Sequence, residues 1–209
     1  MLRSWSTSFM KKIPRKLKLI GGAILVFGLI SFVTYIASPL ARNHIPESFA
    51  NSRNQAASIA EGIVGSLNET SQSLKTVQEY EKQRRAASAL DVVLSEISKN
   101  RAMSDQATAL ALELEKMARA IPGISPDYAA QTALVAISSE AALINQLLAY
   151  TNDLNKLLAL LNKRFGGTYV SEEEINKVIE SINQRTDSIN SLNEQFVGLM
   201  GSFDEYYQN

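Results

Sequence analysis

The sequence SEEEINKVIESINQRTDSINSLNEQFVGLMGSFDEYY, residues 171–207, decides the fold that we predict for this chain. It begins with Ser171 three residues before Glu174. This is a capping box, in which each side chain bonds the backbone N–H of the other residue at a helix N-terminus. Apolar residues then recur at alternating intervals of three and four, the period of a helix that packs through one apolar stripe. We therefore predict one long helix over 171–207.

The segment 126–165 has a matching apolar stripe and is joined to 171–207 by a short turn that contains Gly166 and Gly167. A short connection makes two helices antiparallel neighbours. Because the turn is centred near Thr168, facing residues should have numbers that add up to about 336. The spacing is typical of a coiled-coil seam. The predicted pairs are Leu161–Ile175, Leu158–Val178, Leu154–Ile182, Leu147–Ile189, Ile144–Leu192, Ile137–Leu199 and Ala133–Phe203.

Two layers of this seam contain polar residues. Thr151 would face Arg185, and Glu140 would face Phe196. We predict Thr151 and Arg185 as a polar core layer and keep two interpretations of the arginine. In the first, its guanidinium reaches residues 152–153 and the layer fixes the helical register. In the second, only its aliphatic stem packs in the bundle and the guanidinium reaches water.

The sequence IPGISP, residues 121–126, predicts a turn before this hairpin. Pro122 and Gly123 cannot easily continue a helix, so a helix should end near residue 120. Ser125 is a favourable N-cap, and Pro126 occupies the first helical position, where its missing N–H leaves no hydrogen bond unmade. The turn therefore separates the last two helices from those that precede them.

From Glu47 to this turn the apolar spacing again predicts helix, with two competing break points. The run EKQRR at 81–85 interrupts the stripe, but it consists of strong helix formers without a cap. The run SKNRAMSD at 98–105 offers Asn100 as a stop and Ser104 as an N-cap, so capping chemistry favours it, while continuity through 81–85 stays open. We predict helices over 47–98, 104–120, 126–165 and 171–207, an all-α antiparallel bundle of three to four long helices with coiled-coil-like packing.

The stretch LIGGAILVFGLISFVTYIA, residues 19–37, has no charged residue. As a helix it would be about 28 Å long, close to the thickness of the bilayer core. Residues 1–18 carry basic side chains and no acidic ones, which keeps an N-terminus on the cytoplasmic side of a membrane. We assign membrane anchoring and orientation to Arg3, Lys11, Lys12, Arg15, Lys16 and Lys18.

A cleaved signal peptide is the alternative for this stretch. Its apolar region is usually shorter, and it ends in a small-x-small site. Here Tyr35 and Pro39 occupy the critical positions before the alanines that follow, so we predict an uncleaved, single-pass signal anchor. The predicted organisation is a basic cytoplasmic tail (1–18), a transmembrane helix (19–37), a juxtamembrane linker (38–46) and an extracytoplasmic helical bundle (47–209).

The residues available for chemistry are few. The chain has no cysteine and one histidine, and it contains no phosphate-binding loop, dinucleotide fingerprint, zinc helix or nucleophile elbow. We therefore expect no enzyme, no cofactor and no metal site. When the six basic residues of the tail are set aside, 15 basic and 21 acidic residues remain, a net charge of −6 that does not favour nucleic acid.

These exclusions leave an interaction function. We expect a membrane-anchored scaffold or protein-interaction module of the cell envelope, in contact with the lipid bilayer and acting on a protein partner or by self-association through its helices. The alternative is an extracytoplasmic ligand-sensing four-helix bundle that acts through a membrane partner, with its small-molecule ligand unknown. An internal pocket would favour sensing, whereas a filled core with exposed apolar residues would favour a protein partner.

Overall fold

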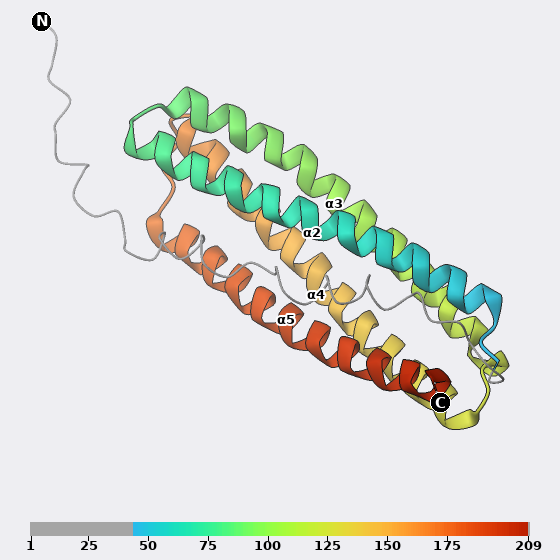
Figure 1. Ribbon diagram of the computed structural model, residues 1–209. Coiled ribbons are helices and arrows are strands. Elements are labelled where there is room, and N and C mark those ends of the chain that lie inside the picture. The colour runs from blue at the N-terminus through green and yellow to red at the C-terminus, as the bar shows by residue number, and fades with distance from the viewer. Residues whose placement is uncertain (1–43, 209) are drawn as a thin grey trace, which may run out of the picture.

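The computed structural model describes residues 44–208, which form four long helices and no strand (Figure 1). This confirms the all-α prediction for the described part of the chain. The predicted cytoplasmic tail, the transmembrane helix and most of the linker lie outside the described residues. The elements are α2 (Glu47–Lys82), α3 (Ala86–Ala120), a short 3-10 turn η3 (Ile121–Gly123), α4 (Asp127–Phe165) and α5 (Glu172–Gln208).

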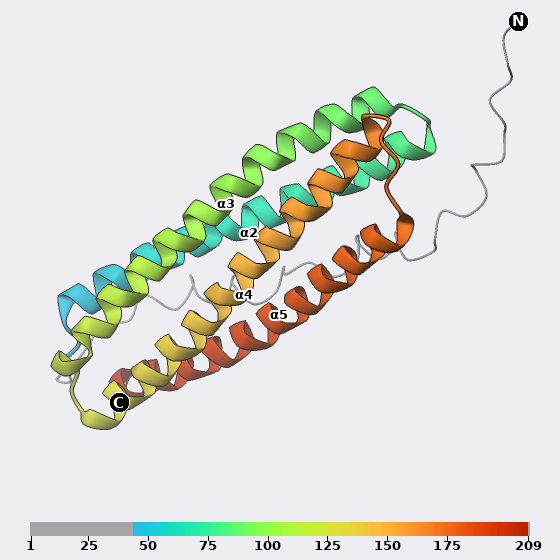
Figure 2. The ribbon, with the colours of Figure 1, turned by 180° about the vertical axis from the view of Figure 1, so that it is seen from behind.

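The helices run side by side along one long axis, and the chain reverses direction at each connection (Figures 1 and 2). α2 packs on α3, α3 packs on α4, and α4 packs on α5. Nine of the ten buried positions of α3 alternate in steps of four and three, the heptad spacing of coiled-coil-like packing. They are Ala89, Val93, Glu96, Asn100, Met103, Ala107, Leu110, Leu114 and Met117, and the tenth is Glu113, beside Leu114.

The break between the first two helices lies at residues 83–85, and the prediction of a break at 98–104 is wrong. α2 ends in a Schellman motif, in which the Arg85 N–H bonds the Tyr80 carbonyl at 2.8 Å and the Arg84 N–H bonds the Glu81 carbonyl at 3.0 Å. This motif needs a left-handed residue, and Arg84 adopts a φ of 60° in place of the usual glycine.

Contacts on both sides of the break explain why α2 ends within a run of strong helix formers. The Arg85 guanidinium lies over the Tyr80 ring, 4.6 Å from its centroid. Glu81 forms an ion pair with Arg164 of α4, with 2.6 Å between Oε1 and Nη2. Cation–π and ionic contacts of this kind stabilise the turn against the helical propensity of the local sequence.

The other helix boundaries lie within two residues of their predicted positions. Ser171 caps α5 as expected, because its Oγ accepts a hydrogen bond of 3.1 Å from the Glu174 N–H. Ser125 does not cap α4, for which Pro126 is the N-cap residue without a side-chain bond. Instead, the Ser125 N–H bonds the His44 carbonyl and the Ser125 carbonyl accepts from the Tyr207 hydroxyl, both at 3.1 Å. Ser125 therefore connects the segment just before α2 and the end of α5 to the turn at 121–126.

The register of α4 and α5 agrees closely with the prediction. Ser181 Oγ bonds Asp153 Oδ2 at 2.6 Å and Ser139 Oγ bonds Gln195 Oε1 at 3.3 Å, so facing numbers add up to 334 rather than about 336. The predicted α4 positions are buried, but four of the predicted α5 positions are only partly buried. The most buried α5 stripe is rotated and runs through Ile175, Ile179, Thr186, Ile189, Asn193, Phe196, Met200, Phe203 and Tyr207.

α4 is the one helix of the described part that is long and apolar enough, by length and composition, to span a bilayer. Many of its apolar residues, among them Leu147, Leu154 and Leu158, are buried within the bundle. A core helix with neighbours on two sides is apolar around much of its circumference. Packing against α3 and α5 therefore accounts for part of the hydropathy of α4.

Candidate functional site: polar layers of the bundle

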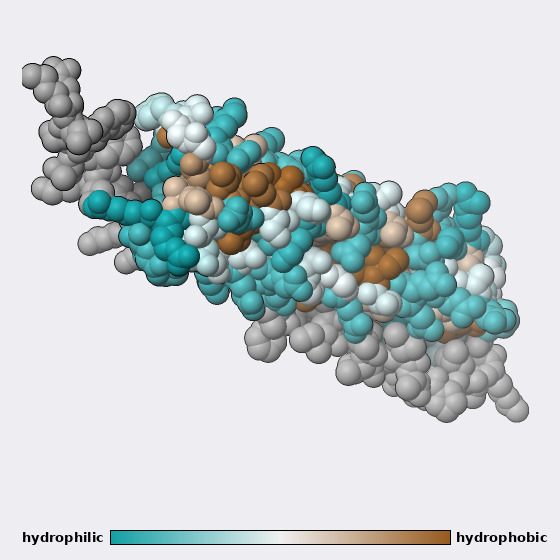
Figure 3. Space-filling view, turned by 90° about the horizontal axis from the view of Figure 1, so that it is seen from above, coloured by the Kyte–Doolittle hydropathy of each residue, from teal (hydrophilic) through white to brown (hydrophobic). Residues whose placement is uncertain are grey.

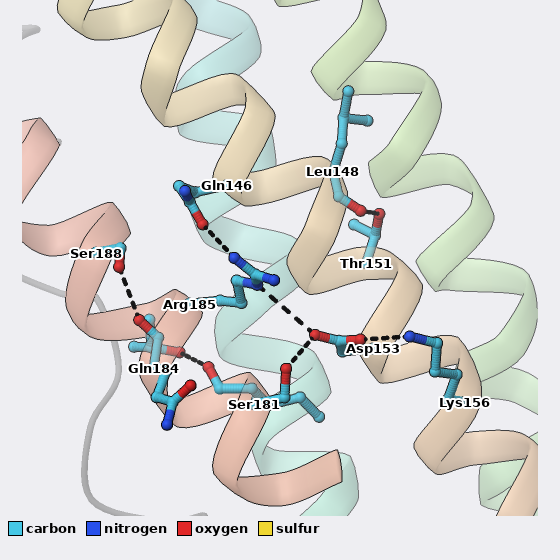
Figure 4. Close-up of polar contacts among 11 residues, drawn as sticks. Gln146, Leu148, Thr151, Asp153, Lys156, Ser181, Gln184, Arg185 and Ser188 are labelled. Atoms are coloured by element: carbon cyan, nitrogen blue, oxygen red, sulfur yellow. Dashed lines mark hydrogen bonds and ion pairs between the residues drawn. The ribbon is translucent and has the colours of Figure 1, made fainter.

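Thr151 and Arg185 lie in separate contacts on two sides of α4 (Figure 4). The Thr151 hydroxyl bonds the Leu148 carbonyl at 2.9 Å, and the Thr151 carbonyl accepts a bond of 2.7 Å from the Asn100 side chain of α3. Arg185 instead donates from Nη1 to Gln146 Oε1 at 3.0 Å. The structure therefore does not bring the predicted pair together, because position 151 faces α3 while position 146 faces α5.

Arg185 combines features of both interpretations given above. Its Nε lies 3.8 Å from Asp153 Oδ2, so the guanidinium does approach an acidic group of α4. Its side chain is 40% exposed, so it also reaches water. Arg185 therefore belongs to the edge of the α4–α5 interface and not to the core.

Asp153 is the centre of this edge network. Burial by itself raises the pKa of Asp153, but hydrogen bonds from Lys156 at 2.8 Å and Ser181 at 2.6 Å outweigh it, so the pKa lies below its ordinary value. Hydrogen bonds to the charged form favour ionisation. The network therefore holds a charged carboxylate between α4 and α5.

A polar layer crosses the bundle about halfway along its length, and we call it the Glu96 layer. Lys99 of α3 bonds Glu69 of α2, and Asn100 of α3 bonds the Thr151 carbonyl of α4, so these stretches lie at one level. The buried polar residues at this level come from all four helices. They are Thr70 and Ser71 of α2, Glu96 and Asn100 of α3, Thr151 of α4 and Thr186 of α5.

Glu96 is 1% exposed, and its charge is matched by a cation from the bundle surface. Lys99 Nζ lies 3.2 Å from Glu96 Oε1 and 3.2 Å from Glu69 Oε2. Its bonds to Glu96 and then to Glu69 raise the pKa of Lys99. Burial, together with the charge of Glu96, raises the pKa of Tyr150 to about 12. The layer thus contains a buried carboxylate with a solvent-accessible partner.

A second polar level, the Glu140 layer, consists of Glu140 of α4 with Asn193 and Phe196 of α5. Glu140 is 4% exposed and Asn193 is 2% exposed. Burial alone raises the pKa of Glu140 to about 7, because no charged group compensates its desolvation. The prediction that residue 140 lies at the level of Phe196 agrees with the α4–α5 register.

Several buried oxygens of these layers have no hydrogen-bond partner within residues 44–208. They are Ser71 Oγ, Glu96 Oε2, Asn100 Oδ1, Glu140 Oε2 and Asn193 Oδ1. Unpaired buried acceptors are costly, so each is a position where a proton or a bound water would be stabilising. No group of three or more histidine, cysteine, aspartate or glutamate residues that could hold a metal occurs in this part of the chain.

Sequence reasoning missed Glu96 and Asn100 as core residues. Asn100 was interpreted as a helix stop, and this placed Glu96 near a helix end. Both residues fall on the apolar stripe of α3 once the helix is drawn as continuous over 86–120. The heptad spacing is therefore the signal that could have found them.

Apolar side chains are also exposed on the outside of the bundle. Leu94 and Leu112 of α3 are half-exposed, and 18 residues equal five helical turns, so they share one face, which we call the outer α3 face. Tyr128, Leu134 and Val135 of α4 are half-exposed as well. Seen from above, apolar side chains gather at separate places among hydrophilic ones (Figure 3).

Two hollows are formed by described residues. A cavity of about 20 Å³ lies between α2, α4 and α5, next to Leu74, Leu157 and Ile179. A shallow depression of about 320 Å³ is lined by α3 alone, and its lining residues include Leu112, Glu115 and Lys116. The first has room for about one water, and the second is open to solvent.

Comparison with known proteins gives no further assignment. No family model, no curated protein and no solved structure matches the chain. The six basic residues assigned to membrane orientation lie outside the described residues. The functional argument therefore depends on the bundle itself.

Proposed function

We propose that this protein is a single-pass scaffold or interaction module of the cell envelope. Its N-terminus is cytoplasmic, its anchor is residues 19–37 in the inner or plasma membrane, and its bundle is extracytoplasmic and binds a protein partner or a second copy. The observation that carries this proposal is the combination of a filled core with half-exposed leucines on the outer α3 face. Exposed apolar side chains on helix faces are the usual material of helix-mediated contacts.

The alternative, a ligand-sensing bundle, needs an enclosed site. Small-molecule pockets usually measure several hundred Å³ and bury most of the ligand. The cavity of about 20 Å³ between α2, α4 and α5 is far below this size. The larger depression is lined by one helix only, so it would leave most of a small ligand in water. The scaffold function is therefore the better supported of the two.

Capture of partners tests the interaction function. The tagged full-length protein is purified from its native membranes in mild detergent, and co-purifying proteins and the oligomeric state are measured. We expect the double variant Leu94→Asp, Leu112→Asp to lose the specific partner or the dimer. Gln72→Asp, which adds a charge to an exposed position of α2, is the matched control and should keep it. A monomer with no specific partner would contradict the scaffold function.

Labelling of introduced cysteines tests the topology. Only the introduced residue can react, because the chain has no cysteine of its own. Ser6→Cys lies in the basic tail, and Tyr169→Cys lies in the exposed turn between α4 and α5. A membrane-impermeant maleimide should label residue 169 in intact cells or spheroplasts and residue 6 only after the membrane is opened. The reverse pattern, or release of the protein without membrane disruption, would contradict the proposed anchor.

A further inference from the structure

Glu140 of α4 and Asn193 of α5 lie at the same level of the core. Ser139, which precedes Glu140, donates from Oγ to the Leu192 carbonyl at 3.4 Å and to Gln195 Oε1 at 3.3 Å. These two acceptors lie on either side of Asn193 in the sequence. Because the side chains of Glu140 and Asn193 are both almost completely buried, the register brings them into one layer of the interior.

Each of these two side chains has an oxygen without a hydrogen-bond partner among the described residues, Glu140 Oε2 and Asn193 Oδ1. An ionised carboxylate only accepts hydrogen bonds, as an amide oxygen does, so the two oxygens cannot bond each other in that state. A protonated carboxyl has an O–H donor. One proton on Glu140 would therefore satisfy both orphaned oxygens with a single O–H···O bond.

Among residues 44–208, no positive charge compensates the burial of Glu140. The part of α3 that passes it, around Ala107 and Leu110, is apolar and buried. The nearby acidic groups are occupied or face outward: Glu113 of α3 pairs with Lys116, and Glu61 of α2, Asp105 of α3 and Glu194 of α5 are exposed. Burial without a cation raises the pKa of Glu140 to about 7, which is in the range of ordinary environmental pH.

We propose that Glu140 and Asn193 form a proton-dependent latch between α4 and α5. The protonated carboxyl of Glu140 donates a hydrogen bond to Asn193 Oδ1 and stabilises the pairing of the two helices. Loss of the proton leaves a buried charge without a compensating partner at the α4–α5 interface and loosens the pair. This goes beyond the proposed function, because the latch responds to pH whether or not the bundle has a partner.

The sign of the pH effect follows from the direction of the pKa shift. The pKa of Glu140 rises from 4.5 to about 7 on folding, so the folded protein binds the proton more tightly. The stabilisation is present at low pH and is lost as the pH rises from 4.5 through about 7. We therefore expect the Tm of the purified full-length protein in detergent to fall between about pH 5 and about pH 8.

Three variants make this measurement specific. Glu140→Gln keeps the shape and a donor but cannot ionise, so the fall in Tm over this window should be largely abolished. Glu113→Gln removes another buried carboxylate, one that has a lysine partner, and should keep the wild-type fall. Asn193→Leu keeps the bulk but removes the acceptor, and should lower the Tm more at about pH 5 than at about pH 8.

Infrared spectroscopy of the wild type tests the latch even if Glu140→Gln does not fold. We expect the carbonyl band of a protonated carboxylic acid, titrating near pH 7, and we expect Asn193→Leu to shift that band to the frequency of an unbonded acid. A wild-type Tm that is flat across this window, or a fall that persists in Glu140→Gln, would overturn the proposal. A band unchanged in Asn193→Leu would overturn the assignment of Asn193 as acceptor.

Discussion

Glu96 in α3 and Glu140 in α4 are both almost completely buried, yet their surroundings differ. Glu96 lies one helical turn from Lys99, whose ammonium group reaches in from the surface and also contacts Glu69 of α2. Among the described residues Glu140 has no such partner, and Asn193 and Phe196 are the buried residues of α5 at its level. The comparison shows that burial alone does not decide the state of a core carboxylate. Glu96 has a cation at the edge of the bundle, whereas burial without such a partner raises the pKa of Glu140.

The largest effect should come from the asparagines that accompany these two carboxylates. Asn100→Ala removes a fully buried hydrogen bond to the Thr151 carbonyl and leaves a cavity between α3 and α4. We expect the free energy of unfolding to fall by about 3 kcal/mol at about pH 8, against about 1–2 kcal/mol for Asn193→Ala, because at that pH Glu140 has lost the proton that it would donate to Asn193 Oδ1. Urea unfolding of the full-length protein in detergent measures both. Equal losses would contradict the difference between the layers.

The next largest effect should come from removing Lys99, which would leave Glu96 without a cation, as Glu140 is. Lys99→Met removes the cation but keeps the aliphatic stem, which leaves the buried carboxylate unpaired. Breaking a fully buried pair costs more, but Lys99 is 42% exposed and screened by water, so we expect a loss of about 1–2 kcal/mol near neutral pH. Adding Glu96→Gln should recover part of it, and a double variant less stable than Lys99→Met would contradict this account.

A smaller effect, whose pH dependence is opposite to that of Glu140, should come from Asp153, at the edge of the α4–α5 interface. Its pKa lies below the ordinary value, so its stabilisation is present near neutral pH and is lost as the pH falls through the folded pKa. Asp153→Asn should lower the free energy of unfolding by about 1 kcal/mol at neutral pH and by less in acid. Thermal unfolding as a function of pH distinguishes this slope from that of Glu140, which has the reverse direction.

The smallest effect should come from Arg185. It is partly exposed, and its hydrogen bond to Gln146 and ion pair with Asp153 lie at the edge of the α4–α5 interface. Arg185→Leu should therefore change the free energy of unfolding by no more than about 0.5 kcal/mol, with partner capture unchanged. A loss of partner with folding intact would show that Arg185 is a recognition residue and not only part of the interface edge.

Local signals predicted the second half of the bundle well. The Ser171–Glu174 capping box, the turn at 121–126 and the three-and-four spacing act within one or two helical turns of the chain, so they are readable without the tertiary structure. The prediction for the first half is wrong at one point, the break between the first two helices. The potential N-cap at Ser104 favours a break near residue 100, but the chain breaks within the charged run 81–85, where Arg84 adopts a left-handed conformation.

The sequence by itself determined the all-α class, the antiparallel pairing of α4 with α5 and its register to within two residues, because periodicity and caps are local properties. The tertiary structure decided the position of the first break, the burial of Glu96 and Asn100, and the separation of Thr151 from Arg185. Each of these depends on contacts between segments far apart in the chain: Glu81 with Arg164, Asn100 with Thr151, and Gln146 with Arg185. A polar residue on a helix is therefore a stop, a core residue or a surface residue according to the helix that packs against it.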